Sequence, residues 1–288
     1  MGGVIGGAQA GECRTLATDD LPELLELLSQ HPVENCFLEH RARVTRLDRR
    51  WVGTEIWGFG EPGRLEAVCH AGSNLVPSHA VPRRALEAFA RRALDGRRRS
   101  DAVFGPAGDV AALWERLGGR WERHVREYRW HQPLMVAEGQ PPIEPDPRVR
   151  LGVLDDMDLL YPAAVAMSTE EVGVSPEAGG NARMYRARVE QLVERGWSFV
   201  LIEDGELVFK AEVAAATPTA CQVQGVYVHP DRRGEGISAP AMAALVAHAT
   251  EHIAPKVTLY VNDFNEAARR AYARSGFVEQ GAYATIMF

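Results

Sequence analysis

The chain has 288 residues, of which 46% are hydrophobic and 25% are charged, a length and composition typical of a globular protein with two domains. It contains no stretch near the ~18 consecutive apolar residues of a membrane-spanning helix, and its glycine-rich start lacks the basic and apolar regions of a secretory signal. We therefore expect a cytoplasmic protein that makes no contact with a membrane.

The net charge of −7 lies entirely in the second half of the chain. Residues 1–150 carry 21 acidic and 21 basic side chains, whereas residues 151–288 carry 18 acidic and 11 basic ones. Nucleic-acid-binding proteins need a basic face, so this distribution argues against DNA or RNA as a partner. An acidic half suits a cationic substrate, but mild acidity is also a common means of staying soluble, and both interpretations stay open.

The first domain is expected to span residues 13–136, after a glycine-rich segment, 1–12, that we expect to be disordered. Apolar periodicity and turn residues predict its elements in this order: helices at 21–30 and 33–46, strands at 54–59 and 65–74, a helix at 82–94, a strand near Val103, a helix at 110–117 and a strand at 127–135. Residues 137–150 follow and contain four prolines, which favour an extended linker between two domains.

The second domain is expected to span residues 151–288. Its predicted elements are helices at 155–166 and 182–195, strands at 198–203 and 206–216, a strand at 221–229, a helix that ends near Ile253, a strand at 257–262, a helix at 265–275, and two strands within 277–288 that are broken near Gly281. Asp204-Gly205 predicts the hairpin turn between the first two strands. Because the element order resembles that of the first domain, we expect two copies of one α+β fold, each a mixed, mostly antiparallel sheet flanked by helices.

The sharpest local motif is the segment Gly225-Val-Tyr-Val-His-Pro-Asp-Arg-Arg-Gly-Glu-Gly-Ile-Ser238, which predicts a strand, a glycine turn and the start of a helix. Gly234 and Gly236 allow the backbone to approach an anion closely, because no Cβ intervenes. With Ser238 as the helix N-cap, the loop amides and the helix N-terminus converge on one point. The segment therefore predicts a pyrophosphate site, to which Arg233 adds positive charge. The Lys-Ser/Thr of a Walker A loop and the third glycine of a dinucleotide fingerprint are both missing.

A second motif downstream helps to interpret the glycine loop. The segment from Leu259 to Phe277 resembles the Asn-x-x-Ala…Tyr…Gly-Phe pattern of the GNAT superfamily of acetyltransferases, with matches at Asn265, Ala268, Tyr272, Gly276 and Phe277. The glycine loop is similar to the Gln/Arg-x-x-Gly-x-Gly/Ala loop of that family, although Asp231 replaces its leading residue. The resemblance covers residues 151–288.

The resemblance implies an N-acyltransferase that uses acetyl-CoA, without a metal, to acylate a primary amine by direct attack on the thioester. It also implies that the strand before the loop splays from its neighbour, so that free amides bind pantetheine and one of them stabilises the oxyanion. The cofactor-binding residues that it implies are Val226, Tyr227, Val228, Arg233, Gly234, Glu235, Gly236, Ile237, Ser238, Asn262, Asn265 and Ala268. The acceptor is expected to be an amine-bearing small molecule, and the protein a monomer or homodimer.

The resemblance assigns Tyr272 as the general acid, with a core aromatic as the alternative. For the general base we expect Glu212, with a pKa raised by burial in its strand; an exposed position or an ion pair with Lys210 would be the structural alternative. Glu170 and Glu171 precede a loop that borders the acceptor site in this fold, which makes them candidate substrate residues. They and the terminal carboxylate of Phe288 are the further candidates for the base.

The two-domain layout looks like that of tandem GNAT proteins, in which one copy is often degenerate. The segment of the first half that corresponds to the glycine loop is Leu75-Val-Pro-Ser-His-Ala80, which has no glycine pair. We therefore expect the first copy to have lost CoA binding and to serve as a scaffold or a wall of the substrate site.

Other functional classes remain as alternatives. The chain could be a catalytically idle module that binds CoA for regulation. The segment His248-Ala-Thr-Glu-His252 matches a metalloprotease pattern, but its histidines fall on the flank of the predicted helix and no further glutamate ligand is evident. The four cysteines are far apart, so we expect reduced thiols and no metal site.

Overall fold

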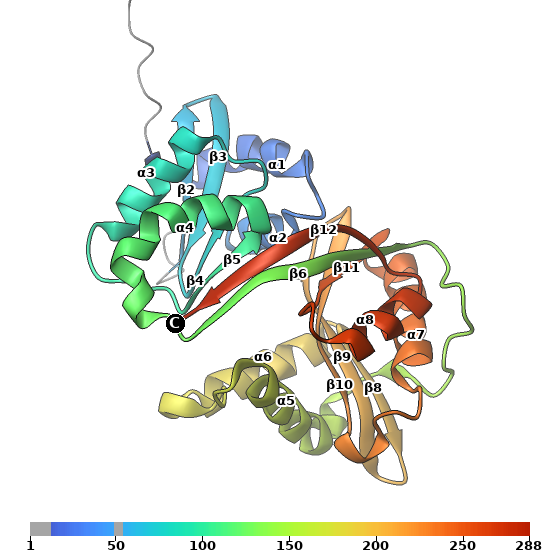
Figure 1. Cartoon of the computed structure of the whole chain (residues 1–288). Helices are drawn as coiled ribbons and strands as arrows, with labels where there is room; N and C mark the ends of the chain where they lie inside the picture. The colour runs from blue at the N-terminus through green and yellow to red at the C-terminus, as the bar shows by residue number, and fades with distance from the viewer. Residues whose placement is uncertain (1–12, 49–53) are drawn as a thin grey trace, which may run out of the picture. The chain divides into compact units, whose positions relative to one another are not determined.

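The computed structural model describes residues 13–48 and 54–288, so the expected disorder of residues 1–12 lies outside the described part of the chain. These residues form two units (Figure 1). Unit 1 contains residues up to 132 together with 283–288, and unit 2 contains residues 133–282. We expected the boundary inside 137–150 and the C-terminus in the second domain. Instead, the boundary precedes Pro133, and the last six residues belong to unit 1.

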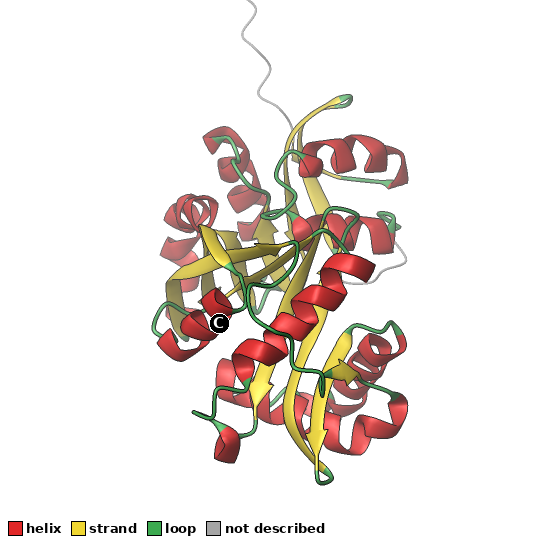
Figure 2. Cartoon of the chain, turned by 90° about the vertical axis from the view of Figure 1, so that its right-hand side faces the viewer, coloured by secondary structure: helices red, strands yellow, loops and turns green. Residues whose placement is uncertain are grey.

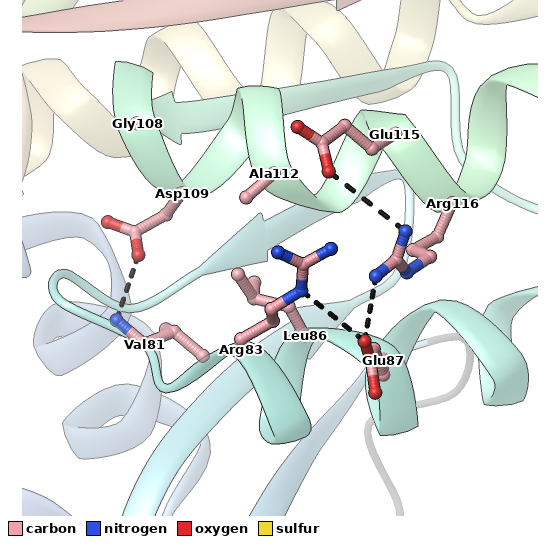
Figure 3. Close-up of a pocket in the computed structure, with 9 residues that line it drawn as sticks. All are labelled: Val81, Arg83, Leu86, Glu87, Gly108, Asp109, Ala112, Glu115 and Arg116. Carbon is pink, nitrogen blue, oxygen red and sulfur yellow. Dashed lines mark hydrogen bonds and ion pairs between the residues drawn. The ribbon is translucent and has the colours of Figure 1, made fainter.

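Unit 1 is a mixed sheet with helices. Its elements are β1 (Cys13–Thr15), α1 (Leu21–Ser29), α2 (Cys36–Thr45), β2 (Glu55–Glu61), β3 (Arg64–Ala71), β4 (Asn74–Pro77), α3 (Arg83–Leu94), β5 (Ala102–Pro106), α4 (Ala107–Trp121), the first part of β6 (Glu127–Glu138) and the second part of β12 (Val278–Met287). Helices α3 and α4 lie side by side (Figure 3) and bury Leu86, Phe89, Leu113 and Leu117 against the sheet.

Unit 2 has the same kind of architecture. After the remainder of β6, its elements are β7 (Arg150–Leu151), α5 (Met157–Val172), α6 (Ala182–Glu194), β8 (Ser198–Glu203), β9 (Glu206–Ala216), β10 (Ala220–Val228), α7 (Ser238–His252), β11 (Lys256–Tyr260), α8 (Glu266–Arg274) and the first part of β12. Figure 2 shows helices packed against the strands of the chain. No helix among the described residues is both long and apolar enough to cross a membrane.

The pairing of strands is the same in the two units. In unit 1, β1, β2, β3 and β4 pair antiparallel in succession, β4 pairs parallel with β5, and β5 pairs antiparallel with β12. In unit 2, β7, β8, β9 and β10 pair antiparallel, β10 pairs parallel with β11, and β11 pairs antiparallel with β6. Two copies of one α+β fold were therefore predicted correctly.

Two of the predicted strands differ from the structure. The predicted strand 65–74 ends early, at Ala71 of β3, because a tight turn at Gly72 and Ser73 reverses the chain and the Gly72 amide donates to the Asn74 carbonyl; Asn74 is the first residue of a further strand, β4, which was not predicted. The expected pair of strands in 277–288 is one strand, β12, which runs through Gly281 without a break. Gly281 does not have a positive φ, so it does not turn the chain.

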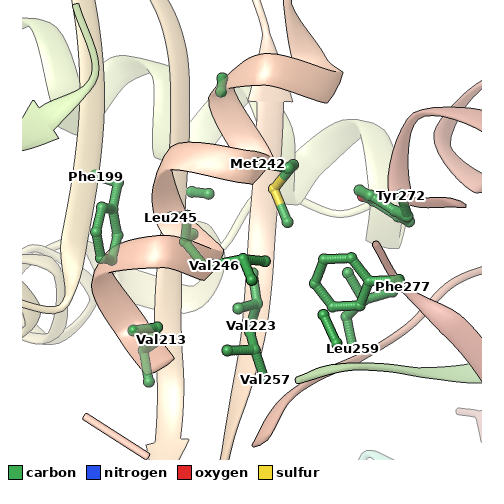
Figure 4. Close-up of a cluster of buried hydrophobic side chains, with 14 of the residues drawn as sticks. Phe199, Val213, Val223, Met242, Leu245, Val246, Val257, Leu259, Tyr272 and Phe277 are labelled. Carbon is green, nitrogen blue, oxygen red and sulfur yellow. The ribbon is translucent and has the colours of Figure 1, made fainter. Parts of the chain in front are cut away.

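The sheet of unit 2 separates two apolar layers. Alternate residues of β8 and β9 point to opposite faces, as the period of a strand requires. Phe199 and Val213 pack against Met242 and Leu245 of α7 on one face (Figure 4), and Tyr272 and Phe277 complete this cluster. The other face carries Val200, Leu207 and Tyr227, which pack against α5 and α6. Each sheet face of unit 2 is therefore covered by its own pair of helices.

Candidate active site

The glycine loop between β10 and α7 has the geometry of an anion site. Gly234 and Gly236 have φ values of +85° and +81°, a region that L side chains rarely adopt, and nothing lies within 4 Å of a Cβ built on either residue. Both glycines are exposed, and the 15-residue helix α7 starts two residues later. Helix α7 therefore directs its positive N-terminus to an open, glycine-lined turn.

Ser238 does not cap this helix. The helix begins at Ser238, its N-cap is Ile237, and no side chain of the N-cap accepts a hydrogen bond from the first turn. The predicted N-cap at Ser238 was therefore wrong by one residue. An apolar N-cap leaves the amides of the first turn for another acceptor, such as water or an anionic ligand.

The arginines of the loop are held by carboxylates. Arg233 donates from Nη1 and Nη2 to the two carboxylate oxygens of Glu170, at 2.9 and 2.7 Å, and from Nε to the Val228 carbonyl at 3.1 Å. Hydrogen bonds from Arg233 lower the pKa of Glu170, and hydrogen bonds to Glu170 raise the pKa of Arg233. Arg232 forms ion pairs with two different carboxylates, those of Glu203 and Glu235, at 3.0 and 2.9 Å. The structure thus joins a predicted cofactor residue, Arg233, to a predicted substrate residue, Glu170.

Strands β10 and β11 separate beside this loop. Their parallel pairing covers only three residue pairs, from Ala220–Lys256 to Gln222–Thr258, although β10 continues to Val228. Beyond Gln222, β10 pairs with β9, with a register shift between Gln224 and Tyr227, where Gly225 has a φ of +64°. The segment Val226–Val228 therefore lies past the end of the β10–β11 pairing, as the resemblance implied for the strand that binds pantetheine.

Glu212 is buried, but its pKa does not behave as we predicted. Its carboxylate accepts hydrogen bonds from Lys210 Nζ at 3.0 Å and from Gln224 Nε2 at 2.9 Å. Burial raises the pKa of Glu212, yet the positive charge of Lys210 and the hydrogen bond from Gln224 outweigh burial, and the pKa is lowered overall. The expected raised pKa was therefore wrong, because the ion pair with Lys210, which we named as the structural alternative, and the hydrogen bond from Gln224 on the neighbouring strand both stabilise the ionised form.

The ion pair of Glu212 with Lys210 is the structural alternative named from the sequence, whereas the part that Gly225 plays in this cluster was missed. Lys210 is 0% exposed, and a Cβ on Gly225 would lie 3.1 Å from both Lys210 Nζ and Glu212 Cδ. Glycine at position 225 thus allows the irregular part of β10 to approach the ion pair. One signal was available: Gly225 lies inside a predicted strand, where a glycine often marks a bulge or a close approach of another group.

Tyr272 lies at the edge of the core of unit 2. Its side chain is 7% exposed and contacts Phe277, with ring centroids 6.0 Å apart (Figure 4). Burial and the negative charge of Glu171 both raise its pKa. The hydroxyl of Tyr272 therefore stays protonated at neutral pH and can donate a proton, while Glu171 is close enough to influence it electrostatically.

The other residues of the second motif build the start of α8. Asn265 is the N-cap of this helix, and its side chain accepts a hydrogen bond from the Ala268 amide at 3.1 Å. The Asn265 amide in turn donates to the Asn262 carbonyl at 2.9 Å. Asn262, Asn265 and Ala268 therefore fix the turn that leads from β11 to α8.

Two further candidates do not join this site. Phe288 belongs to unit 1, where its ring packs against Trp121 at 5.6 Å and under the Arg98 guanidinium at 4.3 Å. The rings of His248 and His252 lie 4.5 Å apart on α7, but residues 13–48 and 54–288 contain no group of three or more residues that could hold a metal ion.

Comparisons with known proteins agree with this geometry. Residues 170–277 match the Acetyltransferase (GNAT) family, and residues 54–160 match a domain of unknown function, DUF4081. A mycothiol acetyltransferase of Acidimicrobium ferrooxidans is 29% identical over 170 residues, which are 57% of this chain and 54% of that protein. The chain thus spans about half the length of this curated relative.

Solved structures match over nearly the whole chain. A GNAT-family acetyltransferase from Colwellia psychrerythraea has a TM-score of 0.61 at 14% identity and covers 96% of this chain and 99% of its own. A tandem GNAT protein from the clavulanic acid biosynthesis pathway has a TM-score of 0.55 at 14% identity and covers 96% and 98%. These likenesses concern the fold.

Proposed function

The chain contains a domain of the GNAT acetyltransferase family, and from this premise we propose that unit 2 binds acetyl-CoA and transfers its acetyl group to a primary amine. The observation that carries the proposal is the combination of an exposed glycine loop at the N-terminus of α7 with the separation of β10 from β11 beside it. The loop suits a pyrophosphate, and the segment Val226–Val228 suits an extended pantetheine arm with an amide at the thioester oxygen.

In the proposed reaction the amine nitrogen attacks the carbonyl carbon of the thioester. The carbonyl oxygen becomes an oxyanion, and an amide of Val226, Tyr227 or Val228 stabilises it. When the oxyanion collapses, the carbon–sulfur bond breaks and CoA leaves as a thiolate. The amine loses one proton and the thiolate gains one, so the reaction needs one acceptor and one donor of protons.

We assign the proton donor to Tyr272 and the proton acceptor to Glu171. A tyrosine hydroxyl is protonated at neutral pH even at its ordinary pKa of ~10, so Tyr272 has a proton to donate. Glu171 is exposed, and its negative charge is one of the causes that raise the pKa of Tyr272, which supports an acid and a base in one neighbourhood.

Glu212 has a different role in this proposal. A carboxylate with a lowered pKa is a weak base, but it is a permanent negative charge. With Lys210 and Gln224 it holds β9 against the irregular part of β10, where the thioester would lie. We propose that this cluster positions the segment Val226–Val228, and that Glu212 is a positioning residue.

The proposed acceptor is a small molecule and the proposed compartment is the cytoplasm. Acetyltransferase action on a small molecule is the activity named for the A. ferrooxidans relative. The four cysteines lie far apart in the sequence, a spacing that supports reduced thiols and a reducing compartment.

The test is release of CoA thiol from acetyl-CoA in the presence of a panel of primary amines, together with calorimetry of CoA binding. Binding with amine-dependent thiol release is expected. Binding without release for any amine would favour the idle regulatory module, and the absence of CoA binding would contradict both ideas.

A further inference from the structure

Unit 1 contains the counterpart of the phosphate-binding turn of unit 2. In unit 1, β4 lies between an antiparallel and a parallel neighbour and leads through residues 78–82 into α3. In unit 2, β10 has the same two kinds of neighbour and leads through residues 229–237 into α7. We call the loop amides and the N-terminus of the following helix the phosphate corner of each unit.

A carboxylate occupies the phosphate corner of unit 1. Asp109 of α4 accepts a hydrogen bond from the Val81 amide at 2.8 Å (Figure 3) and another from the Ala80 amide at 3.1 Å. Ala80 has a φ of +57°, so a residue with a Cβ adopts the left-handed conformation that glycines adopt in the other corner. The two amides that point into the corner are therefore already bound to an anion from the chain itself.

The two units differ at one equivalent position. Asp109 is the third residue of α4, the helix that follows the parallel strand β5. Ala268 is the third residue of α8, the helix that follows the parallel strand β11. At this position unit 2 has a methyl group, whereas unit 1 has a carboxylate that accepts hydrogen bonds from the amides of its own corner.

We propose that Asp109 is a built-in anion that occupies the phosphate corner of unit 1 and keeps phosphate-bearing ligands out. The comparison of corners rests on the proposed function of unit 2, but the occupation of the corner by Asp109 does not. The proposal explains why unit 1 keeps the fold of a cofactor-binding unit without binding a cofactor: the anion that the fold accommodates is supplied by its own helix.

The surroundings of Asp109 act on its charge in both directions. The side chain is buried, and burial raises its pKa by more than the two amides and the nearby His79 lower it, so the pKa is raised overall. His79 Nδ1 lies 3.6 Å from Asp109, so a positive charge on the histidine would strengthen the contact. The neighbouring cations Arg83 and Arg116 both form ion pairs with Glu87, at 3.6 and 2.7 Å. These two ion pairs are therefore with Glu87 and not with the Asp109 carboxylate.

The cavity beside Asp109 is small. It has a volume of about 230 Å³ and lies between α3 and α4 (Figure 3), with Val81, Arg83, Leu86, Asp109 and Arg116 among its lining residues. Pockets for ligands of cofactor size measure ~300–1,000 Å³. The cavity therefore has room for an inorganic anion once the carboxylate is gone, but not for a whole CoA molecule.

The test uses the full chain with Gly236→Asp as the parent, so that the corner of unit 2 is closed, and inorganic pyrophosphate as the calorimetric probe. We expect the parent to bind no pyrophosphate and Asp109→Ala in that parent to bind one per chain. The matched control is Glu115→Ala, which removes the same charge from the same helix at a side chain that is 63% exposed. We expect no binding in the control.

Two results would overturn the proposal: pyrophosphate binding by Glu115→Ala equal to that by Asp109→Ala, or a folded Asp109→Ala without binding.

Asp109→Asn provides a second measurement, since it keeps the size of the side chain but turns one acceptor into a donor that faces an amide. We expect its melting temperature to fall by about 2–10 °C. An unchanged melting temperature would mean that the carboxylate does not hold the corner. Failure of the proposed function would show separately, as a lack of CoA binding by the wild-type chain.

Discussion

Arg233 and Glu170 form a two-bond ion pair between the glycine loop and the end of α5, with nitrogen–oxygen distances of 2.9 and 2.7 Å. A guanidinium that donates two parallel hydrogen bonds is suited to a carboxylate or a phosphate in equal measure. Glu170 therefore occupies the same two donors that a phosphate of CoA would use. Cofactor binding at this loop would have to release Glu170.

Glu170→Gln is expected to strengthen CoA binding. The substitution removes the negative charge that competes for Arg233, and an exposed ion pair contributes ~0–1 kcal/mol, which corresponds to at most about a fivefold lower Kd. Calorimetry with CoA measures the change. Glu203→Gln is the control, because it removes the same charge from a carboxylate that pairs with Arg232 instead. Equal effects of both substitutions would mean that only the overall charge matters.

CoA is expected to bind once per chain, in unit 2 alone. Gly236→Asp should abolish this binding, because the substitution places a side chain and a negative charge where the pyrophosphate would lie. Gly205→Asp is the matched control: Gly205 has a φ of +80°, close to the +81° of Gly236, and also lies in open space, but in the β8–β9 turn. The control should bind CoA normally. A stoichiometry of two would contradict the prediction.

Tyr272→Phe is expected to lower kcat by ~10²-fold while leaving CoA affinity nearly unchanged. The phenyl ring preserves the contact with Phe277, so the substitution removes only the hydroxyl. Steady-state kinetics and calorimetry on the same variant separate the two effects. If kcat is unchanged, the hydroxyl has no part in proton transfer and Tyr272 is a core residue.

The Lys210–Glu212 pair is expected to matter for stability. Lys210→Met leaves the buried Glu212 carboxylate without its cation, which should cost ~3–5 kcal/mol of unfolding free energy, whereas Lys210→Met with Glu212→Leu should restore much of this loss. Urea unfolding of both variants and of the wild type measures the difference. A double variant that is less stable than Lys210→Met would show that the two charges do not depend on each other.

The same pair predicts how unit 2 responds to acid. The folded pKa of Glu212 is lowered, so its ionised form stabilises the fold above its ordinary pKa of ~4.3, and this stabilisation is lost as the pH falls through the lowered value. The acid limb of the pH–rate profile should therefore not arise from Glu212 near neutral pH. Glu212→Gln should therefore leave any acid limb near neutral pH in place, and a limb that disappears in this variant would contradict the positioning role of Glu212.

Sequence patterns predicted the local elements of this chain well and its long-range partners poorly. Strands β8 and β9 have the predicted bounds, because a hairpin with Asp204-Gly205 at its turn is specified by neighbouring residues. The ion pair of Glu212 with Lys210 was among the alternatives because the two residues are close in sequence, but the hydrogen bond from Gln224 was not foreseen, since Gln224 reaches Glu212 from another strand. Asp109 lies 29 residues from Ala80, and no local pattern indicates that they meet. The fold thus followed from periodicity, whereas the electrostatics depended on which strands pair.

The position of the C-terminal strand has a consequence for biosynthesis. Residues 283–287 supply the antiparallel partner of β5, and the hydroxyl of Tyr283 donates to the Glu34 carbonyl within unit 1. When Gln132 leaves the ribosome, the sheet of unit 1 still lacks this strand, and the intervening 133–282 must be translated first. At ~5–20 residues per second this takes roughly 8–30 s. During that interval the edge of β5 is unpaired, so a nascent chain stalled before Tyr283 should be a better substrate for chaperones and proteases than the finished protein.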